Sequence, residues 1–102
     1  MASRIWTACH VSEALVKAFQ ENGIVGTVIE LTPKGEDAQV IYSGFFPSEA
    51  ISLTGFHRAV EVDGIVFDNI VTKGISRADW EASLSTLRGN FAQSFIVKTT
   101  PF

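Results

Sequence analysis

Cys9, His57 and Asp68 carry the three functional groups from which proteins assemble a nucleophilic site: a thiol, an imidazole and a carboxylate. In such a site the thiolate attacks a carbonyl carbon, the imidazole takes up the thiol proton, and the carboxylate orients the ring. The chain has a single cysteine, so Cys9 is its one candidate nucleophile of this kind. Whether the three groups act together depends on the elements that position them.

The segment 55–71 predicts a β-hairpin that places His57 beside Asp68. Its centre is Asp63-Gly64, a pair typical of two-residue turns because both residues tolerate a positive φ. With these residues at the turn, side-chain alternation puts His57 and Asp68 on one face of the hairpin and Asn69 on the other. A three-residue loop would shift this parity and bring Asn69 beside His57. A surface pair without a catalytic role has the same spacing, so both interpretations stay open.

Residues 7–22 predict an amphipathic helix. Thr7 suits the N-cap position, and Asn22-Gly23 is a typical stop signal. The apolar residues recur at helical spacing and form one stripe, which comprises Val11, Ala14, Leu15, Ala18 and Phe19. We expect this stripe to lie against the rest of the domain.

Cys9 falls in the first turn of this helix, where the partial positive charge of the N-terminus favours thiolate over thiol. At about 100° per residue it lines up with Val16 and Gln20, away from the centre of the apolar stripe. A lone cysteine is also often a small buried hydrophobe, and this alternative stays open. Neighbouring residues on a helix point in different directions, so His10 is a poor base for the thiol and belongs on the surface or a cleft wall.

The other segments predict an α+β domain. Residues 24–32 and 38–43 read as strands because they are rich in β-branched and apolar residues. Residues 44–55 read as an irregular loop, and residues 91–99 as the last strand. Together with the hairpin, these strands predict one antiparallel sheet.

A second helix is expected to begin after Ser76, with Asp79 as a weak capping-box partner. Gly89-Asn90 is its predicted end. The apolar stripe of this helix comprises Trp80, Leu84 and Leu87, and we expect Trp80 in the core.

Composition and charge restrict the classes of function. The 102 residues suit one domain over 1–102, and the closeness of Met1 to Cys9 suggests that this domain is excised from a longer chain. The net charge of −3 argues against nucleic acid as a partner, because binding phosphates needs a basic patch. No apolar run approaches the length of a membrane span, so no membrane partner is expected.

The sequence offers no motif for a cofactor or a metal. A single cysteine excludes an internal disulfide framework and a cysteine-rich zinc site. Cys9, His10, His57 and Asp68 lack the spacing of a zinc site. There is also no phosphate-binding glycine motif.

The hairpin and the segment after it resemble the papain-fold toxin domains of bacterial polymorphic toxin systems, in particular the second papain-fold toxin family. The motifs that carry the resemblance are Gly55–Ile70, Gly74-Ile75-Ser76-Arg77, Asp79-Trp80, and, in the first helix and after it, Glu13-Ala14-Leu15 and Asn22-Gly23-Ile24. The resemblance covers nearly the whole chain. It is most specific around Phe67-Asp68-Asn69-Ile70 and loosest around Cys9.

The resemblance implies a papain-like α+β fold, with an N-terminal helix packed on an antiparallel sheet of about four to five strands and a second helix. It also implies a catalytic set that falls on Cys9, His57 and Asp68, with Asn69 as the alternative third member. The implied activity is that of a cysteine hydrolase (a protease, deamidase or acyl transferase) with a protein or peptide substrate, acting as a toxin effector. An immunity protein is the implied partner, and the cytoplasm of a target cell is the implied place of action for the C-terminal domain of a secreted bacterial toxin.

One departure from papain-like proteases concerns the oxyanion hole. Those enzymes use a glutamine side chain a few residues before the cysteine, whereas no Gln or Asn precedes Cys9. Backbone N–H groups at the start of the helix are the expected substitute, which leaves deamidation, acyl transfer and other amide hydrolysis open beside proteolysis.

Two other classes of function compete with the hydrolase. One is an interaction module on the same fold that acts by binding alone. The other is a small nuclease that uses His57 and Arg58, which the acidic pI of about 5.2 disfavours.

Overall fold

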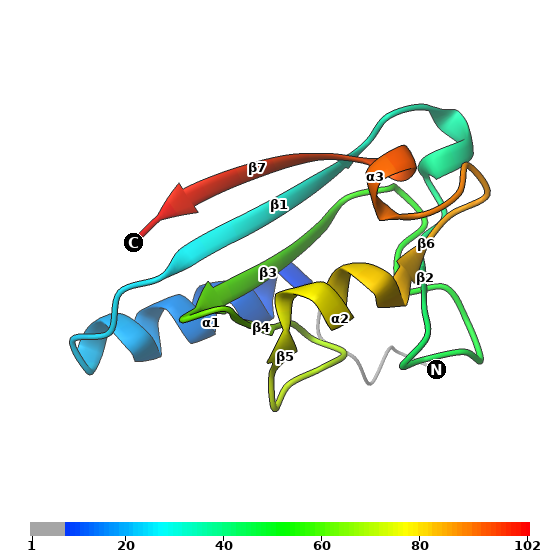
Figure 1. Cartoon of the computed structure of the whole chain (residues 1–102). Coiled ribbons are helices and arrows are strands. Elements are labelled where there is room, and N and C mark those ends of the chain that lie inside the picture. The colour runs from blue at the N-terminus through cyan, green and yellow to red at the C-terminus, as the bar shows by residue number, and fades with distance from the viewer. Residues whose placement is uncertain (1–7) are drawn as a thin grey trace.

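The computed structural model describes the backbone of residues 8–102 and the side chains from residue 11 onward. The fold is α+β, with an N-terminal helix on a five-stranded antiparallel sheet of order β5-β4-β3-β1-β7 (Figure 1). The elements are, in chain order, α1 (Ala8–Glu21), β1 (Thr27–Pro33), η1 (Glu36–Ala38), β2 (Tyr42–Ser43), β3 (His57–Val62), β4 (Ile65–Phe67), β5 (Ile75–Ser76), α2 (Arg77–Ser83), β6 (Leu84–Ser85), α3 (Phe91–Ser94) and β7 (Phe95–Pro101). None of the described helices is long and apolar enough to cross a membrane.

The central hairpin forms in the predicted register. Asp63 and Gly64 have φ values of 52° and 80°, so both residues of the two-residue turn lie in the left-handed region that Gly and Asp tolerate. Val62 pairs with Ile65, and the ladder continues to Val60 and Phe67, where β4 ends. The parity that places His57 and Asp68 on one face is therefore confirmed.

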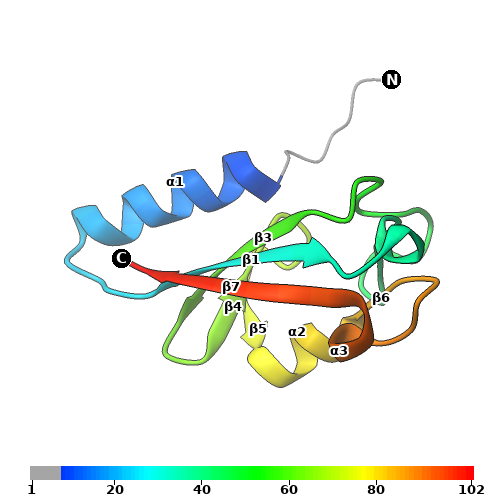
Figure 2. The same ribbon diagram turned by 90° about the horizontal axis from the view of Figure 1, so that it is seen from above.

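The sheet has two faces with different coverings, and Figure 2 shows α1 on one side of the sheet and α2 and α3 on the other. The side that we call the α1 face carries Val28, Glu30, Arg58, Val60 and Phe67. The opposite side, the core face, carries Ile29, Leu31, Ala59 and Val66, which form the hydrophobic core with Ile41, Trp80, Leu84 and Phe95. His57 and Asp68 belong to the core face because side chains alternate along each strand.

Helix α1 turns a slightly different face to the sheet than the one predicted. Ala14 and Ala18 are exposed, whereas Ser12 is buried and Val16 is half-buried. Leu15 and Phe19 of the predicted stripe are half-buried, and the Phe19 ring lies 5.7 Å from that of Phe67. Alanine offers little area to bury, so the larger side chains set the orientation of the helix.

The prediction for the second helix is wrong at its C-terminal end. Helix α2 stops at Ser83, because Leu84 takes an extended conformation and pairs with Ser43 of β2. Leu87 is 80% exposed and is not part of the core. The end of α2 is fixed by a pairing with a distant strand, which local sequence signals do not contain.

Asn90 begins a helix and does not end one. Its side chain accepts a hydrogen bond from the Gln93 N–H, and the Gln93 side chain accepts one from the Asn90 N–H, which is a capping box. The last strand therefore starts at Phe95 and not at residue 91. The strand predicted at 38–43 is likewise shorter, since η1 occupies its beginning and only Tyr42–Ser43 is extended.

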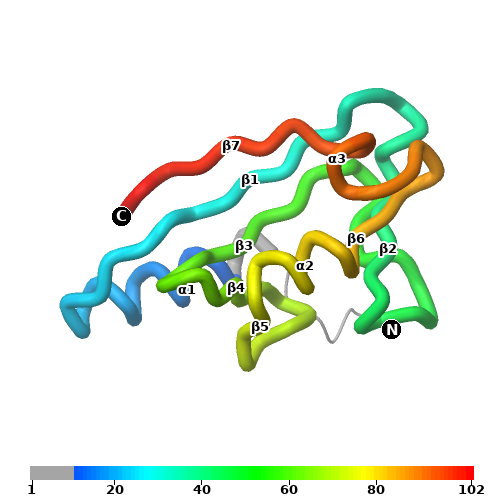
Figure 3. The backbone as a smooth tube through the Cα atoms, viewed as in Figure 1, coloured from blue at the N-terminus to red at the C-terminus, as the bar shows by residue number. Residues whose placement is uncertain are grey.

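The path of the chain in Figure 3 explains why the strand ends matter for the site. The chain enters β3 from the long loop after β2, so His57 is the first residue of its strand. Asp68 directly follows the last residue of β4, where the chain turns toward β5 and α2. Both residues therefore lie at one end of the hairpin, beside α2.

Candidate functional site

His57 and Asp68 are in direct contact. The His57 Nε2 atom lies 2.9 Å from Asp68 Oδ2, and the side chains are 1% and 2% exposed. This is the contact that the hairpin register predicts, and the hydrogen bond at this His57 ring nitrogen is made by Asp68 and not by Asn69.

Asp68 accepts hydrogen bonds on both carboxylate oxygens. Oδ2 also accepts the Trp80 indole N–H at 2.9 Å, while Oδ1 accepts the backbone N–H groups of Ile70 and Val71 at 2.9 and 2.7 Å. Four donors around one buried carboxylate satisfy its hydrogen-bonding capacity. The two backbone bonds fold the chain tightly after β4 and fix the carboxylate in place.

The pKa of Asp68 is lowered in the folded chain. Burial acts in the opposite direction and favours the neutral acid. The hydrogen bond and the charge of His57, the Val71 N–H and the Trp80 indole together outweigh burial. Asp68 is therefore a carboxylate at neutral pH.

An ionised Asp68 determines the tautomer of His57. A carboxylate only accepts hydrogen bonds, so the Nε2 atom that contacts it must carry the proton. In the neutral ring, Nδ1 then has the free lone pair. The arrangement gives an imidazole with one nitrogen fixed as a donor to Asp68 and the other available as a base.

Trp80 completes this buried cluster from α2. Ser76 caps the helix by accepting the Asp79 N–H, and one turn later Trp80 enters the core with 1% exposure. Its ring lies 6.5 Å from that of His57 in a stacked arrangement. The Arg77 guanidinium lies 5.9 Å from the centre of the Trp80 ring.

Helical periodicity predicts Trp80 as a core residue but not its hydrogen bond to Asp68. A signal for it exists, because a buried tryptophan usually finds an acceptor for its indole N–H. Arg77 strengthens the same region: it forms ion pairs with Glu61 of β3 at 2.9 Å and with Glu81 of α2 at 2.6 Å. These bonds tie α2, and with it Trp80, to the hairpin.

Cys9 lies in the first turn of α1, but its side chain is outside the described residues, as is that of His10. The predicted N-cap, Thr7, is also outside them. The described part of α1 lies over the α1 face, whereas His57 and Asp68 lie on the core face. The structure thus brings two of the three predicted residues, His57 and Asp68, into contact.

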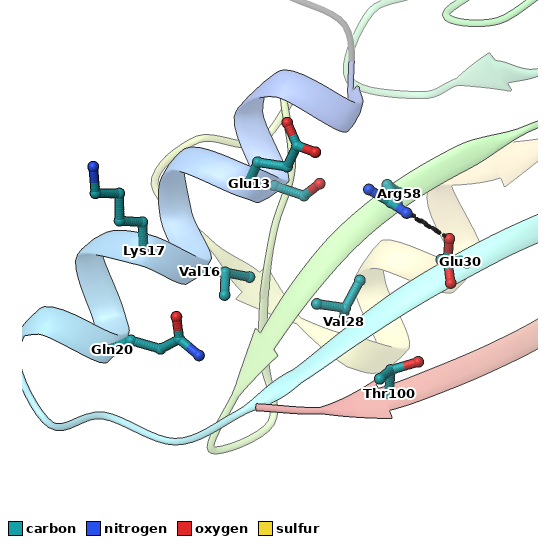
Figure 4. Close-up of a pocket in the computed structure, with 9 residues that line it drawn as sticks. Glu13, Val16, Lys17, Gln20, Val28, Glu30, Arg58 and Thr100 are labelled. Atoms are coloured by element: carbon teal, nitrogen blue, oxygen red, sulfur yellow. Dashed lines mark hydrogen bonds and ion pairs between the residues drawn. The ribbon is translucent and has the colours of Figure 1, made fainter.

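A cavity of about 340 Å³ lies between α1 and the α1 face of the sheet. Figure 4 shows Val16 and Gln20 of α1 directed toward the sheet, opposite Val28 and Arg58. The lining comprises Ser12, Glu13, Val16, Lys17, Gln20, Val28, Glu30, Arg58 and Thr100.

Arg58 faces this cavity and pairs with Glu30. Its Nε and Nη2 atoms both donate to Glu30 Oε2, at 3.2 and 2.8 Å. The hydrogen bond from Arg58 is the main cause that lowers the pKa of Glu30. Since Arg58 and His57 point to opposite faces, the structure does not bring together the two residues that a nuclease would use.

Among the described residues, no group of three or more His, Cys, Asp or Glu side chains has the geometry of a metal site. The Asp68 oxygens are occupied by hydrogen-bond donors.

The sequence of the chain was compared with models of known protein families. The model of the family described as papain fold toxin 2 matches residues 4–85. The chain belongs to this family. The match of this papain-fold toxin domain includes Cys9, His57, Asp68 and Trp80, whereas α3 and β7 lie beyond it. The comparisons found no curated protein and no solved structure that matches this chain.

Proposed function

We propose that this papain-fold toxin domain is a cysteine hydrolase that acts on an amide or acyl bond of a protein or peptide. Cys9 is the nucleophile, His57 the general base and acid, and Asp68 the residue that orients His57. Proteolysis, deamidation and acyl transfer all follow from this set of groups. The domain acts as a toxin effector in the cytoplasm of a target cell and is held in check by an immunity protein.

The observation that supports this proposal best is the buried His57–Asp68 contact with its fixed tautomer. A structural ion pair needs no particular ring nitrogen, whereas a base for a thiol needs one nitrogen held as a donor and the other left with its lone pair. The Asp68 contact at Nε2 supplies that arrangement. Membership in a papain-fold family supports a cysteine as the third member.

The reaction proceeds in two halves. His57 Nδ1 takes the Cys9 thiol proton, and the thiolate attacks the carbonyl carbon to form a tetrahedral intermediate. Imidazolium then protonates the leaving amine, the carbon–nitrogen bond breaks, and a thioester remains. Water, or the acceptor in a transfer reaction, attacks the thioester after giving its proton to His57, and the thiolate leaves.

The start of α1 is the proposed oxyanion site. The first N–H groups of an α-helix have no acceptor within the helix and carry partial positive charge. Because Cys9 lies in the first turn of α1, its own N–H is close to any carbonyl that its sulfur attacks. These backbone donors take the place of the missing glutamine.

The two faces of the sheet restrict how Cys9 reaches His57. A thiol at the beginning of α1 must approach the ring past the first residue of β3, because the sheet separates the two faces elsewhere. The pairing of β4 with β3 ends at Val60 and Phe67, so no described β4 residue pairs with His57. This end of β3 is the proposed meeting point.

Expression of the domain inside bacteria tests the proposal. We expect growth arrest with the native chain and loss of arrest with Cys9→Ala and His57→Ala. His10→Ala is the matched control, since it removes an imidazole next to Cys9 that has no proposed role. Circular dichroism and expression level establish that each variant folds. Growth arrest that persists in well-folded Cys9→Ala would overturn the cysteine mechanism.

A binding module without activity is the second candidate, and one observation favours it. The His57 side chain is 1% exposed and lies on the core face, where a structural cluster also satisfies the Asp68 carboxylate and the Trp80 indole N–H. This candidate predicts toxicity that depends on the fold and not on Cys9. The same set of variants therefore separates the two functions.

A further inference from the structure

Strand β7 forms an outer edge of the five-stranded sheet. In Figure 1 it runs along the border of the molecule, and no other described element pairs with its outer side. Of its seven residues only Phe95 is buried, and 96–101 are exposed. A long edge strand with accessible main-chain groups is a template for a further strand.

The hydrogen bonds at both ends of the β1–β7 ladder show which groups remain on the outer side. Gly26 and Phe102 exchange N–H···O bonds of 3.2 and 2.9 Å, and at the other end the Lys34 N–H donates to the Ser94 carbonyl at 2.9 Å. In an antiparallel ladder such bonded pairs recur at every second residue. The β7 residues bonded to β1 are therefore Ile96, Lys98 and Thr100.

The outward main-chain groups belong to the residues between these. Val97 and Thr99 each present an N–H and a carbonyl on the free edge. Pro101 has no N–H, and the Phe95 N–H already donates to the Phe91 carbonyl. Val97 and Thr99 are thus the β7 residues that have both a free N–H and a free carbonyl on the outer side. The Lys98 side chain lies between them on the α1 face.

We propose that this edge binds an extended strand of a different polypeptide, which runs antiparallel to β7 and places a carboxylate opposite Lys98. On the free edge Lys98 occupies a non-hydrogen-bonded position, where the side chains of opposed residues lie closest. An acidic residue there forms a cross-strand ion pair. On the other side of β7, Glu30 of β1 lies opposite Lys98 in the ladder, so an acidic residue already occupies the position across from this lysine.

A second copy of β7 suits the edge poorly. The two-fold register centred on Lys98 opposes two ammonium groups, which destabilises the pair. The register centred on Thr99 places Pro101, which lacks a donor, opposite Val97. The register centred on Val97 relies on Phe95, whose N–H is already used. A strand of another sequence avoids all three defects.

The probe for this proposal is a synthetic peptide with the sequence of β1, Thr27–Pro33. It can place its glutamate opposite Lys98 and two residues with free N–H groups opposite Val97 and Thr99. In the free chain we expect faster amide hydrogen exchange at Val97 and Thr99 than at Ile96 and Lys98. Excess peptide should slow exchange at Val97 and Thr99, as measured by NMR.

Charge and donor variants make the test specific. A peptide with Glu30→Lys should bind about two- to fivefold more weakly, and Lys98→Glu in the chain should restore its binding. Val97→Pro removes one outward N–H while it leaves the bonds to β1 in place, and it should abolish binding.

Three results would overturn the proposal. The first is that millimolar peptide does not slow amide exchange at Val97 and Thr99. The second is that the Val97→Pro variant binds the peptide as tightly as the native chain. The third is that exchange at Val97 and Thr99 is already slow without peptide and that sedimentation shows the chain alone to be a dimer. Because Cys9 has no part in this edge, Cys9→Ala should bind the peptide like the native chain. The outcome is therefore independent of the proposed hydrolase activity.

Discussion

The two carboxylate oxygens of Asp68 have different partners. One accepts hydrogen bonds from side chains, and the other accepts them from the backbone that holds Asp68 in position. Oδ2 accepts from His57 and Trp80, and Oδ1 accepts from the N–H groups of Ile70 and Val71. A change at this residue therefore alters both the tautomer of the imidazole and the turn after β4. Asn69, the next residue, makes neither of these contacts to His57 or Trp80.

This asymmetry predicts unequal effects of two neighbouring substitutions. Asp68→Ala should lower the activity of the domain by about 10⁴-fold, because the ring loses the partner that sets its tautomer and orientation. Asn69→Ala should have a much smaller effect. Growth arrest titrated against inducer level in bacteria compares the two. Equal loss in both variants would contradict the assigned role of Asp68.

The indole N–H of Trp80 is expected to hold the Asp68 carboxylate in its charged form. Trp80→Phe keeps an aromatic ring in the core but removes this donor, so the pKa of Asp68 should rise toward its ordinary value. The loss should also destabilise the fold by about 1.5–3 kcal/mol, the usual worth of a hydrogen bond to a charged group.

Carboxyl carbon chemical shifts followed against pH measure this effect directly. Phe91→Leu is the matched control, since the Phe91 and Trp80 ring centroids lie 5.6 Å apart while the indole N–H donates to Asp68. It should change stability and leave the pKa of Asp68 where it is. A purely structural role for Trp80 would show the same Asp68 titration in both variants.

The proposed mechanism requires the beginning of α1, which carries Cys9, to lie close to the beginning of β3, which carries His57. If α1 brings Cys9 to the beginning of β3, the thiol and the imidazole titrate as neighbours. We expect the pH profile of iodoacetamide alkylation to have its inflection below about 8.5, the value of a free thiol. His57→Gln should move the inflection upward by about one unit or more, because it removes the cationic partner of the thiolate.

The single cysteine makes the labelling unambiguous. His10→Gln is the control, because it tests whether any imidazole close in sequence has the same effect. Identical profiles for the native chain and His57→Gln would show that the two residues do not meet. Cys9 would then stay on the side of the sheet opposite His57, and the proposed triad would be excluded.

The elements that could be predicted are those fixed by local chemistry. The Asp63-Gly64 turn sets the hairpin register by itself, and from that register the His57–Asp68 contact follows. The Ser76 cap likewise fixes where α2 begins. These signals act within a few residues, so they can be predicted from the local sequence.

The remaining features depend on partners that are distant in the chain. The end of α2 follows from the pairing of Leu84 with Ser43, and the bond between Trp80 and Asp68 joins different elements. That α1 lies over the face opposite His57 follows from packing against Phe67, which periodicity does not specify. The hairpin pattern therefore predicted the His57–Asp68 contact, whereas the side of the sheet on which α1 lies was not predicted.

For the whole molecule, the buried carboxylate couples folding to pH. The folded chain lowers the pKa of Asp68, so the unfolded chain binds its proton at a higher pH than the folded chain does. The stabilisation from ionised Asp68 is present in full above the unfolded value of about 3.9. It is lost as the pH falls from there through the lower pKa of the folded state.

Asp68→Asn isolates this contribution, because the amide does not titrate and every other carboxylate is common to both chains. At neutral pH the native chain should be more stable than Asp68→Asn by about 1–3 kcal/mol, since the amide cannot accept from all the donors that surround it. Urea unfolding at a series of pH values should show this difference in the free energy of unfolding shrinking below about pH 4. Two curves that stay parallel from pH 7 to pH 2 would contradict the lowered pKa of Asp68. The buried carboxylate would then contribute to stability by packing and neutral hydrogen bonds alone.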